Sequence, residues 1–414
     1  MQPIKVADRK KGERTMPDHI KFNRTELAGS LGDLGTILPL AIGMILINGL
    51  SPTGLILGVG LYYVFSGLYF RVTCPVEPMK VIGAYAVATG ITATQIQASS
   101  LWIFFFLFII GATGLMTLAG RYIPKPVIRG VQLSTGVLLV SQGVRLMMGT
   151  SKFQSLHLAA EPYLSVQKMG WLPIGLIIGL VLGLLTLLLL ENRRLPAALV
   201  VVGAGALVGI VLGTRQGLDQ VRFGLYLPEV LPFGWPSGAD FSFALLVLVL
   251  PQIPMTLGNA VIANADLSIQ YFPQDGRRVT YRALCVSMAL ANLLSFFLGG
   301  MPMCHGAGGL ASRYRFGART AGSNLIIGAI FLILALFLGS HSLAVIYMLP
   351  MAALGVLLIF SGIQLTLTLL DMQSRKDLFV PILVLGITLA SNLAAGFLTG
   401  IAVAYLLKWK RLSV

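Results

Sequence analysis

The chain has 414 residues, of which 56% are hydrophobic and only 11% are charged, and its mean hydropathy is +0.85. A water-soluble domain of this composition would expose too much apolar surface, so the sequence excludes that class and predicts an all-α polytopic membrane protein. Lys and Arg number 30 against 15 Asp and Glu. This net charge of +15 indicates either a nucleic-acid-binding surface or a membrane topology signal.

Hydropathy, with Gly and Pro taken as boundaries, predicts fourteen membrane-spanning segments in two sets of seven. The first set is expected at residues 27–47, 52–70, 76–90, 101–120, 127–148, 171–190 and 195–213. The second set is expected at residues 241–262, 281–299, 302–312, 321–339, 343–370, 378–391 and 394–407. The third and tenth segments are short and interrupted by Gly and Pro, which predicts a half-helix at each position and two inverted repeats.

These segments divide the chain into an N-terminal tail (1–25), a first repeat of seven spans (26–213), a connecting loop (214–240), a second repeat of seven spans (241–407) and a C-terminal tail (408–414). With both tails in the cytoplasm, 24 of the 30 basic residues lie on the cytoplasmic side, 5 lie outside and Lys80 lies within a span. Topology thus explains the net charge. We expect a multi-pass protein of the cell membrane with no nucleic-acid partner, no cleavable signal peptide and no separate domain after residue 407.

The first segment opens with glycines and a carboxylate. Residues 32–36 read Gly32-Asp33-Leu34-Gly35-Thr36, where a lipid-facing helix would carry large apolar residues. Because burying a carboxylate in a membrane is costly, Asp33 is a candidate functional residue; the alternative is a helix cap at the cytoplasmic interface.

The third segment begins with Pro75-Val76-Glu77-Pro78-Met79-Lys80. Two prolines three residues apart predict extended backbone that leads into a helix start inside the membrane, where unpaired N–H groups and the positive end of the helix dipole favour an anion. Glu77 and Lys80 are spaced to pair on one face of this helix, so each either contacts the ligand or neutralises the other.

The second half repeats both features. Residues 251–259 contain Gln252, Thr256 and Asn259, and residues 301–309 run Met301-Pro302-Met303-Cys304-His305-Gly306-Ala307-Gly308-Gly309. If the halves are inverted, the two helix starts face one ligand, and neutral hydrogen-bonding side chains surround it. This arrangement predicts a site for a small oxyanion.

Several side chains have two interpretations. His305 is either a ligand-facing or proton-coupling group or a structural histidine bonded to a carbonyl. Cys74 and Cys304 with His305 could form a soft-metal site, but Cys is also common as a small buried residue, so we expect neither a metal nor a cofactor. Arg313, Arg315 and Arg319 are interpreted as cytoplasmic topology determinants that could also draw in anions.

Four segments resemble the signatures of the molybdate transporter family related to sulfate permeases: residues 32–36, 75–80, 251–261 and 301–320. The resemblance implies the fold of that superfamily, in which spans 1–4 and 8–11 form a core domain and spans 5–7 and 12–14 form a gate domain. It also implies high-affinity molybdate uptake by secondary active transport and a homodimer formed through the gate domain.

Residue patterns and resemblance together give one candidate site. The expected substrate-contacting residues are Asp33, Gly35, Thr36, Glu77, Met79, Lys80, Gln252, Thr256, Asn259, Met303, Cys304, His305 and Gly306. Proton coupling is assigned to Glu77, Asp33 and His305. The sequence departs from the family at Glu77, where Gln is usual, and a carboxylate beside a dianion would have to be protonated, paired or turned away. We therefore expect proton-coupled symport.

Other functions stay open. Phosphate-loop, HExxH and GxSxG motifs do not occur in the sequence, so an ATP-driven pump or a common hydrolase is not expected. The alternatives are a sulfate or tungstate carrier, an anion channel, a nucleobase or bicarbonate carrier on the same fold, and an enzyme acting through His305 and Cys304.

Overall fold

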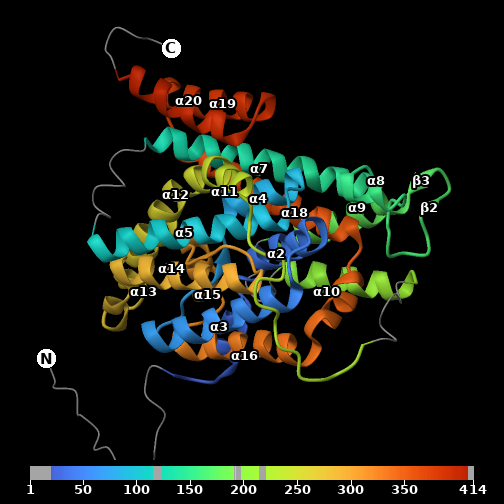
Figure 1. The fold of residues 1–414 in the computed structure, drawn as a ribbon. Coiled ribbons are helices and arrows are strands. Elements are labelled where there is room, and N and C mark those ends of the chain that lie inside the picture. The colour runs from blue at the N-terminus through green and yellow to red at the C-terminus, as the bar shows by residue number, and fades with distance from the viewer. Residues whose placement is uncertain (1–19, 115–123, 191, 193–196, 214–220, 409–414) are drawn as a thin grey trace, which may run out of the picture.

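The computed structural model describes residues 20–114, 124–190, 192, 197–213 and 221–408. Most of these residues are helical, and the strands among them form two short antiparallel pairs (Figure 1). Most of the predicted N-terminal tail, part of the connecting loop and nearly all of the C-terminal tail lie outside the described residues.

In the first half, the elements are α1 (Arg24–Ser30), α2 (Leu34–Asn48), α3 (Pro52–Phe70), β1 (Glu77–Pro78), α4 (Lys80–Thr89), α5 (Ala93–Thr113), α7 (Lys125–Met148), α8 (Lys152–Leu156), β2 (Lys168–Met169), β3 (Leu172–Pro173), α9 (Ile174–Leu189) and α10 (Ala197–Val211).

In the second half, the elements are α11 (Gly238–Phe243), η1 (Ala244–Val249), α12 (Leu250–Met255), η2 (Thr256–Ala263), α13 (Asn264–Tyr271), η3 (Asp275–Arg278), α14 (Tyr281–Leu298), β4 (Met303–Cys304), α15 (Ala307–Arg315), α16 (Ala321–Leu338), η4 (Gly339–His341), α17 (Ser342–Tyr347), α18 (Met351–Thr366), η5 (Leu367–Asp371), α19 (Arg375–Ala390) and α20 (Leu393–Leu406). The elements η1 and η2 are π-helical, and η3, η4 and η5 are 3₁₀-helical.

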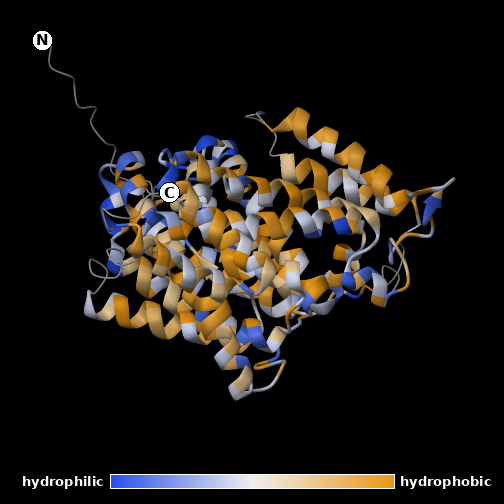
Figure 2. Cartoon of the chain, turned by 90° about the horizontal axis from the view of Figure 1, so that it is seen from above, coloured by the Kyte–Doolittle hydropathy of each residue, from blue (hydrophilic) through white to orange (hydrophobic). Residues whose placement is uncertain are grey.

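The membrane class expected from composition is confirmed. In the described part of the chain, seven helices are long and apolar enough to cross a membrane, and α1 with α2, which are bent by 40° at their junction, would form an eighth span. Helices α4, α9, α10 and α20 are apolar but shorter. Hydrophobic residues cover most of the length of the helices, as expected for surfaces that face lipid or a buried core (Figure 2).

Several predicted segments differ from the helices that form, and for three of them the cause is local. The segment expected at 101–120 begins earlier, at Ala93, because Thr92 and Gln95 form a capping box that places the polar start inside α5. The segment expected at 343–370 is divided into α17 and α18, since Pro350 caps α18 and cannot continue the preceding helix. The segment expected at 241–262 is longer in the structure, since it extends without a break from the start of α11 to the end of α13. The π-helical turns on either side of α12 accommodate the prolines of α12.

Long helices from the two halves pack against each other. Helix α7 packs on α18, α3 on α16 and α5 on α14, while α19 and α20 lie beside α7 at one edge of the molecule (Figure 1). Glycines bring α7 and α18 into close contact: a Cβ at Gly136 would lie 2.6 Å from the carbonyl oxygen of Gly362, and one at Gly143 would lie 2.5 Å from that of Gly355. Side chains at these positions would separate the helices.

Candidate functional site

The two proline-containing segments meet at one point of the fold. In the antiparallel pair β1–β4, Glu77 lies opposite Cys304 and Pro78 lies opposite Met303. Helix α4 begins after β1, and α15 begins after β4. The first turns of two short helices, one from each half of the chain, therefore start from the same strand pair.

A cavity of about 620 Å³ reaches these helices. One wall is formed by α2, α4, the π-helical segment η2 and α15. Of the residues expected to contact substrate, Gly35, Thr36, Lys80 and Asn259 line this wall, and Gly308 lies beside them. The wall thus presents the ammonium of Lys80, a hydroxyl and an amide, which are hydrogen-bond donors suited to an oxygen-rich anion, and Arg315 of α15 also lines the cavity.

The opposite wall comes from α7, α9, α10, α18 and η5. It contributes neutral polar side chains, namely Gln132, Thr186, Ser361, Gln364 and Thr368. Nothing in the sequence singles these residues out, because they are isolated polar positions in long apolar helices. Their common position around a cavity is what identifies them as candidate site residues.

Glu77 and Lys80 form an ion pair in the structure. Their carboxylate and ammonium groups are 3.2 Å apart, and the side chain of Glu77 is fully buried whereas that of Lys80 is 18% exposed. Lys80 therefore faces both the buried carboxylate and the cavity. Gly306, also expected in the site, is the N-cap residue of α15 and lies against the Glu77 carboxylate.

Gln252 caps the start of α4. Its Oε1 accepts hydrogen bonds from the backbone N–H groups of Val81 and Ile82 at 2.9 and 3.2 Å, and its Nε2 donates to the hydroxyl of Thr256 at 2.9 Å. Both polar side chains are 1% exposed and are not among the residues that line the cavity. Gln252 thus satisfies backbone donors that the first turn of a helix leaves unpaired.

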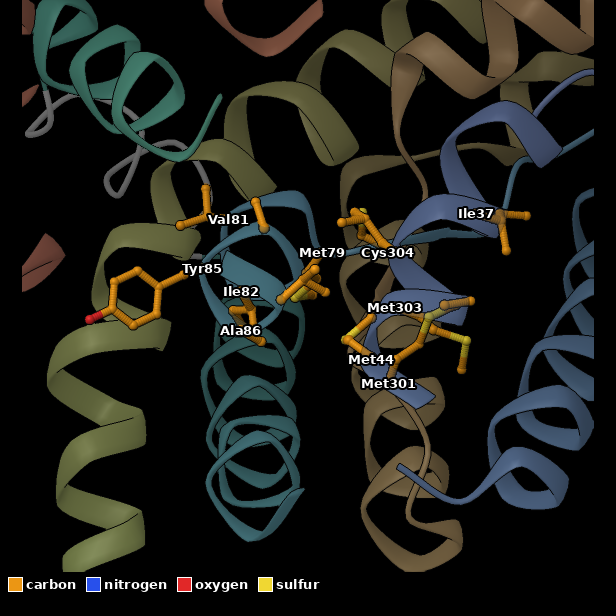
Figure 3. Close-up of a cluster of buried hydrophobic side chains, with 14 of the residues drawn as sticks. Ile37, Met44, Met79, Val81, Ile82, Tyr85, Ala86, Met301, Met303 and Cys304 are labelled. Carbon is orange, nitrogen blue, oxygen red and sulfur yellow. The ribbon is translucent and has the colours of Figure 1, made fainter. Parts of the chain in front are cut away.

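Three further candidates lie in the apolar core. Met79, Met303 and Cys304 are buried in a cluster that also contains Met44 and Met301 (Figure 3). Met303 and Cys304 form β4 and Met79 follows β1, and none of the three is among the residues that line the cavity. In this arrangement they support the backbone of the two helix starts.

His305 is buried and fully hydrogen-bonded. Its Nδ1 lies 2.7 Å from the carbonyl oxygen of Pro75, so this nitrogen carries the proton and donates it. Its Nε2 then accepts from the hydroxyl of Tyr62 at 2.6 Å, and the hydroxyl of Ser287 lies 3.0 Å from the same nitrogen. The Cys74 sulfur is 3.3 Å from Nδ1. The ring connects β1 to helices α3 and α14 and is not exposed to the cavity.

Asp33 pairs with Arg313. The carboxylate is 3.1 Å from Nη1 of Arg313, both side chains are fully buried, and the hydroxyl of Tyr63 donates to the second carboxylate oxygen at 2.7 Å. Arg313 is thus not an exposed topology determinant. The sequence could not indicate this pair, because its members are separated by most of the chain.

A model of the family described as "Molybdate transporter of MFS superfamily" matches residues 25–139 and 244–365. The chain belongs to the molybdate transporter family. The matched residues include β1, α4, β4, α15 and most of the cavity walls. The resemblance found in the sequence is confirmed, and the chain is a membrane transporter rather than an enzyme.

Similar proteins agree with this family. Molybdate transporter 2 of Arabidopsis thaliana is 31% identical over 424 residues, which cover 94% of this chain and 88% of that protein. The structure of SLC26A9 matches 93% of the chain with a TM-score of 0.61 at 14% identity, and the chain spans 65% of the length of SLC26A9. The transmembrane domain of the cyanobacterial bicarbonate transporter BicA matches 92% of the chain, and 97% of that domain, with a TM-score of 0.62 at 16% identity. At such identities these structures establish the fold alone.

Proposed function

We propose that this chain is a secondary active transporter that takes up molybdate with high affinity. The observation that carries the proposal is the cavity wall at which Lys80, Thr36 and Asn259 converge beside the N-terminal turn of α15. The ammonium of Lys80, neutral donors and the positive end of a helix suit a small oxyanion that must bind and also leave.

Molybdate is proposed over other anions because the family and the similar plant protein carry that name. Sulfate and tungstate are tetrahedral dianions of the same charge, so the donors alone do not discriminate between them. Transport of sulfate or tungstate, either by a carrier or by a channel on this fold, is the second candidate.

For the mechanism, we propose fourteen segments in two inverted repeats, with half-helices at β1–α4 and β4–α15. The core domain would contain α2, α4, η2 and α15, and the gate domain would contain α7, α9, α10 and α18. The cavity between these two sets of elements supports this division. With both termini in the cytoplasm of a cell-membrane protein, the cavity would open inward, and relative motion of the two domains would expose the site to either side.

We further propose that Thr36, Lys80, Asn259, Gly35 and the turn at Gly306 bind the anion. Asp33, Gln252, Thr256, Met79, Met303, Cys304 and His305 would position these elements, since they are buried and satisfied within the protein. Proton coupling is assigned to Glu77 alone. A homodimer through the gate domain is retained as a proposal by analogy.

The test is uptake of radiolabelled molybdate into proteoliposomes that contain only this protein. Unlabelled tungstate and sulfate are added as competitors. We expect molybdate uptake that excess sulfate does not abolish. Uptake of sulfate with no uptake of molybdate, by protein shown to be folded, would retain the fold and overturn the substrate.

A further inference from the structure

The first turn of α15 already has an anion against it, and that anion belongs to the protein. Glu77 is fully buried, and its carboxylate lies against this turn: a Cβ at Gly309 would be 2.7 Å from Oε1, and a Cβ at Gly306 would overlap Oε2. Glycine at both positions leaves room for the carboxylate. Helix α15 has no side-chain cap from its own N-cap residue. Glu77 therefore occupies the position that an external oxyanion would be expected to take.

The Glu77 carboxylate is held by charge rather than by a hydrogen-bond network. Among the described residues, neither of its oxygens has a hydrogen-bond partner of normal geometry; its polar neighbours are the ammonium of Lys80, 3.2 Å away, and the hydroxyl of Thr36. Buried carboxylates usually accept several hydrogen bonds, so this one is unusual. Few bonds would have to be broken for another anion to replace it.

The start of α4 offers an internal comparison. The two short helices are capped across the repeats, α4 by Gln252 of the second half and α15 by Glu77 of the first half. The cap on α4 is a neutral amide with two backbone hydrogen bonds, whereas the cap on α15 is charged and lacks them. The replaceable cap is therefore the one on α15, and Lys80, the first residue of α4, lies beside it at the cavity wall.

We propose that the Glu77 carboxylate is a tethered anion that competes with the substrate oxyanion for Lys80 and the first turn of α15. This inference rests on the proposed function and names the competitor within that site. The oxyanion binds when Glu77 is protonated or turned away, because two negative groups beside one lysine repel each other. Proton uptake and anion binding are thereby linked at a single position.

The other titratable groups near Glu77 are engaged elsewhere. Asp33 is paired with Arg313, the hydroxyl of Tyr63 donates to Asp33, and the thiol of Cys304 faces the carbonyl of Pro78 at 3.8 Å. Lys80 is the cation that the carboxylate and the substrate would share. A change of charge at Glu77 therefore acts first on Lys80.

The experiment measures equilibrium binding of radiolabelled molybdate to the purified full-length chain in lipid nanodiscs, from mildly acidic to mildly alkaline pH. We compare the wild type with Glu77→Gln and Glu77→Ala. The matched control is Glu26→Gln, because Glu26 is another buried carboxylate, which accepts from the backbone N–H groups of Arg319 and Thr320.

We expect the dissociation constant of the wild type to increase as the pH rises and that of both Glu77 variants to stay low. At mildly alkaline pH the difference should be on the order of tenfold, the factor that ~1.4 kcal/mol produces. The control should behave as the wild type does. Variants that fold but bind molybdate more weakly, or that keep the wild-type pH dependence, would overturn the inference.

The experiment distinguishes failure of the tethered-anion inference from failure of molybdate as the proposed substrate. If the wild type binds no molybdate, the proposed substrate is wrong, and the same comparison is made with whichever of sulfate and tungstate binds. Tighter, pH-independent binding of that anion by both Glu77 variants would still support the tethered anion. Equal binding by the wild type and the variants would refute it.

Discussion

Replacement of Arg313 should destabilise the protein strongly. The guanidinium is fully buried, and its Nε donates to the hydroxyl of Thr73 at 2.8 Å. Nη1 donates to the carbonyl of Ser30 and to Asp33, each at 3.1 Å, and Nη2 donates to Ser323 and Asn324 at 3.1 and 2.8 Å. This single side chain joins the α1–α2 junction, the segment before β1 and the first turn of α16 to α15.

The magnitude follows from what Arg313→Met would leave behind. Asp33 would remain buried, with the hydroxyl of Tyr63 as its remaining side-chain donor among the described residues. Removing one member of a buried ion pair costs about 3–5 kcal/mol, because the other charge is left uncompensated. Removing the second charge in Arg313→Met/Asp33→Asn should restore part of this loss. The sum of the stability losses of the two single variants should exceed the loss of the double variant by about 1–3 kcal/mol.

The assay is the free energy of unfolding of each purified variant in detergent, with the apparent melting temperature as a second readout. The control is Arg282→Met, which alters an exposed arginine in the first turn of α14 and should change the free energy by less than about 0.5 kcal/mol. A loss of less than about 1 kcal/mol for Arg313→Met, or additive single losses, would refute the structural role given to this pair.

Three further predictions concern the cavity, the helix contact and a loop. Lys80→Met should raise the dissociation constant for molybdate at least about tenfold, since it removes the cation beside the first turn of α15; unchanged binding would remove Lys80 from the site. Gly143→Leu should lower the melting temperature, because its side chain would meet the backbone of α18 at Gly355, and an unchanged value would contradict that contact. Burial raises the pKa of Glu161, in the loop between α8 and β2, from 4.5 to about 7 although two backbone N–H groups of α18 donate to it. Since the pKa of Glu161 is higher in the folded state than in the unfolded state, its contribution to the stability of the fold is complete below about pH 4.5 and is lost as the pH rises through about 7. Glu161→Gln should therefore make the melting temperature less dependent on pH over that range. An unaltered dependence of the melting temperature on pH would contradict this.

Composition and hydropathy were sufficient to predict the helical membrane class and most helix positions, because lipid-facing helices leave a strong apolar signal. The segment expected at 52–70 is helix α3 itself. Helix ends were less predictable where a local cap overrides hydropathy, as Thr92 does at the start of α5. The break before α18 could have been found from Pro350, which lies within an otherwise apolar run.

The sequence predicts contacts between residues that are close along the chain better than contacts between its two halves. The pairing of Glu77 with Lys80 was expected from a shared helix face. The pair forms, although Glu77 lies in β1 and only Lys80 lies in α4. Contacts between the halves carry no such signal: the sequence gives no indication that Gln252 caps α4 or that Asp33 meets Arg313. Asp33 and His305 are candidate functional residues because they are polar groups in apolar segments. The structure shows that each has hydrogen-bond partners within the protein. A buried polar residue is thus a guide to a functional region, but only its partners distinguish a ligand contact from a structural bond.

The most direct test of the account is whether the protein concentrates molybdate. Proteoliposomes with equal radiolabelled molybdate on both sides of the membrane are given an inward proton gradient, and the internal molybdate is followed with time. A proton-coupled transporter should accumulate molybdate above the external concentration, and the accumulation should collapse when a protonophore removes the gradient. Equilibration without accumulation, at any gradient, would contradict secondary active transport and indicate a channel.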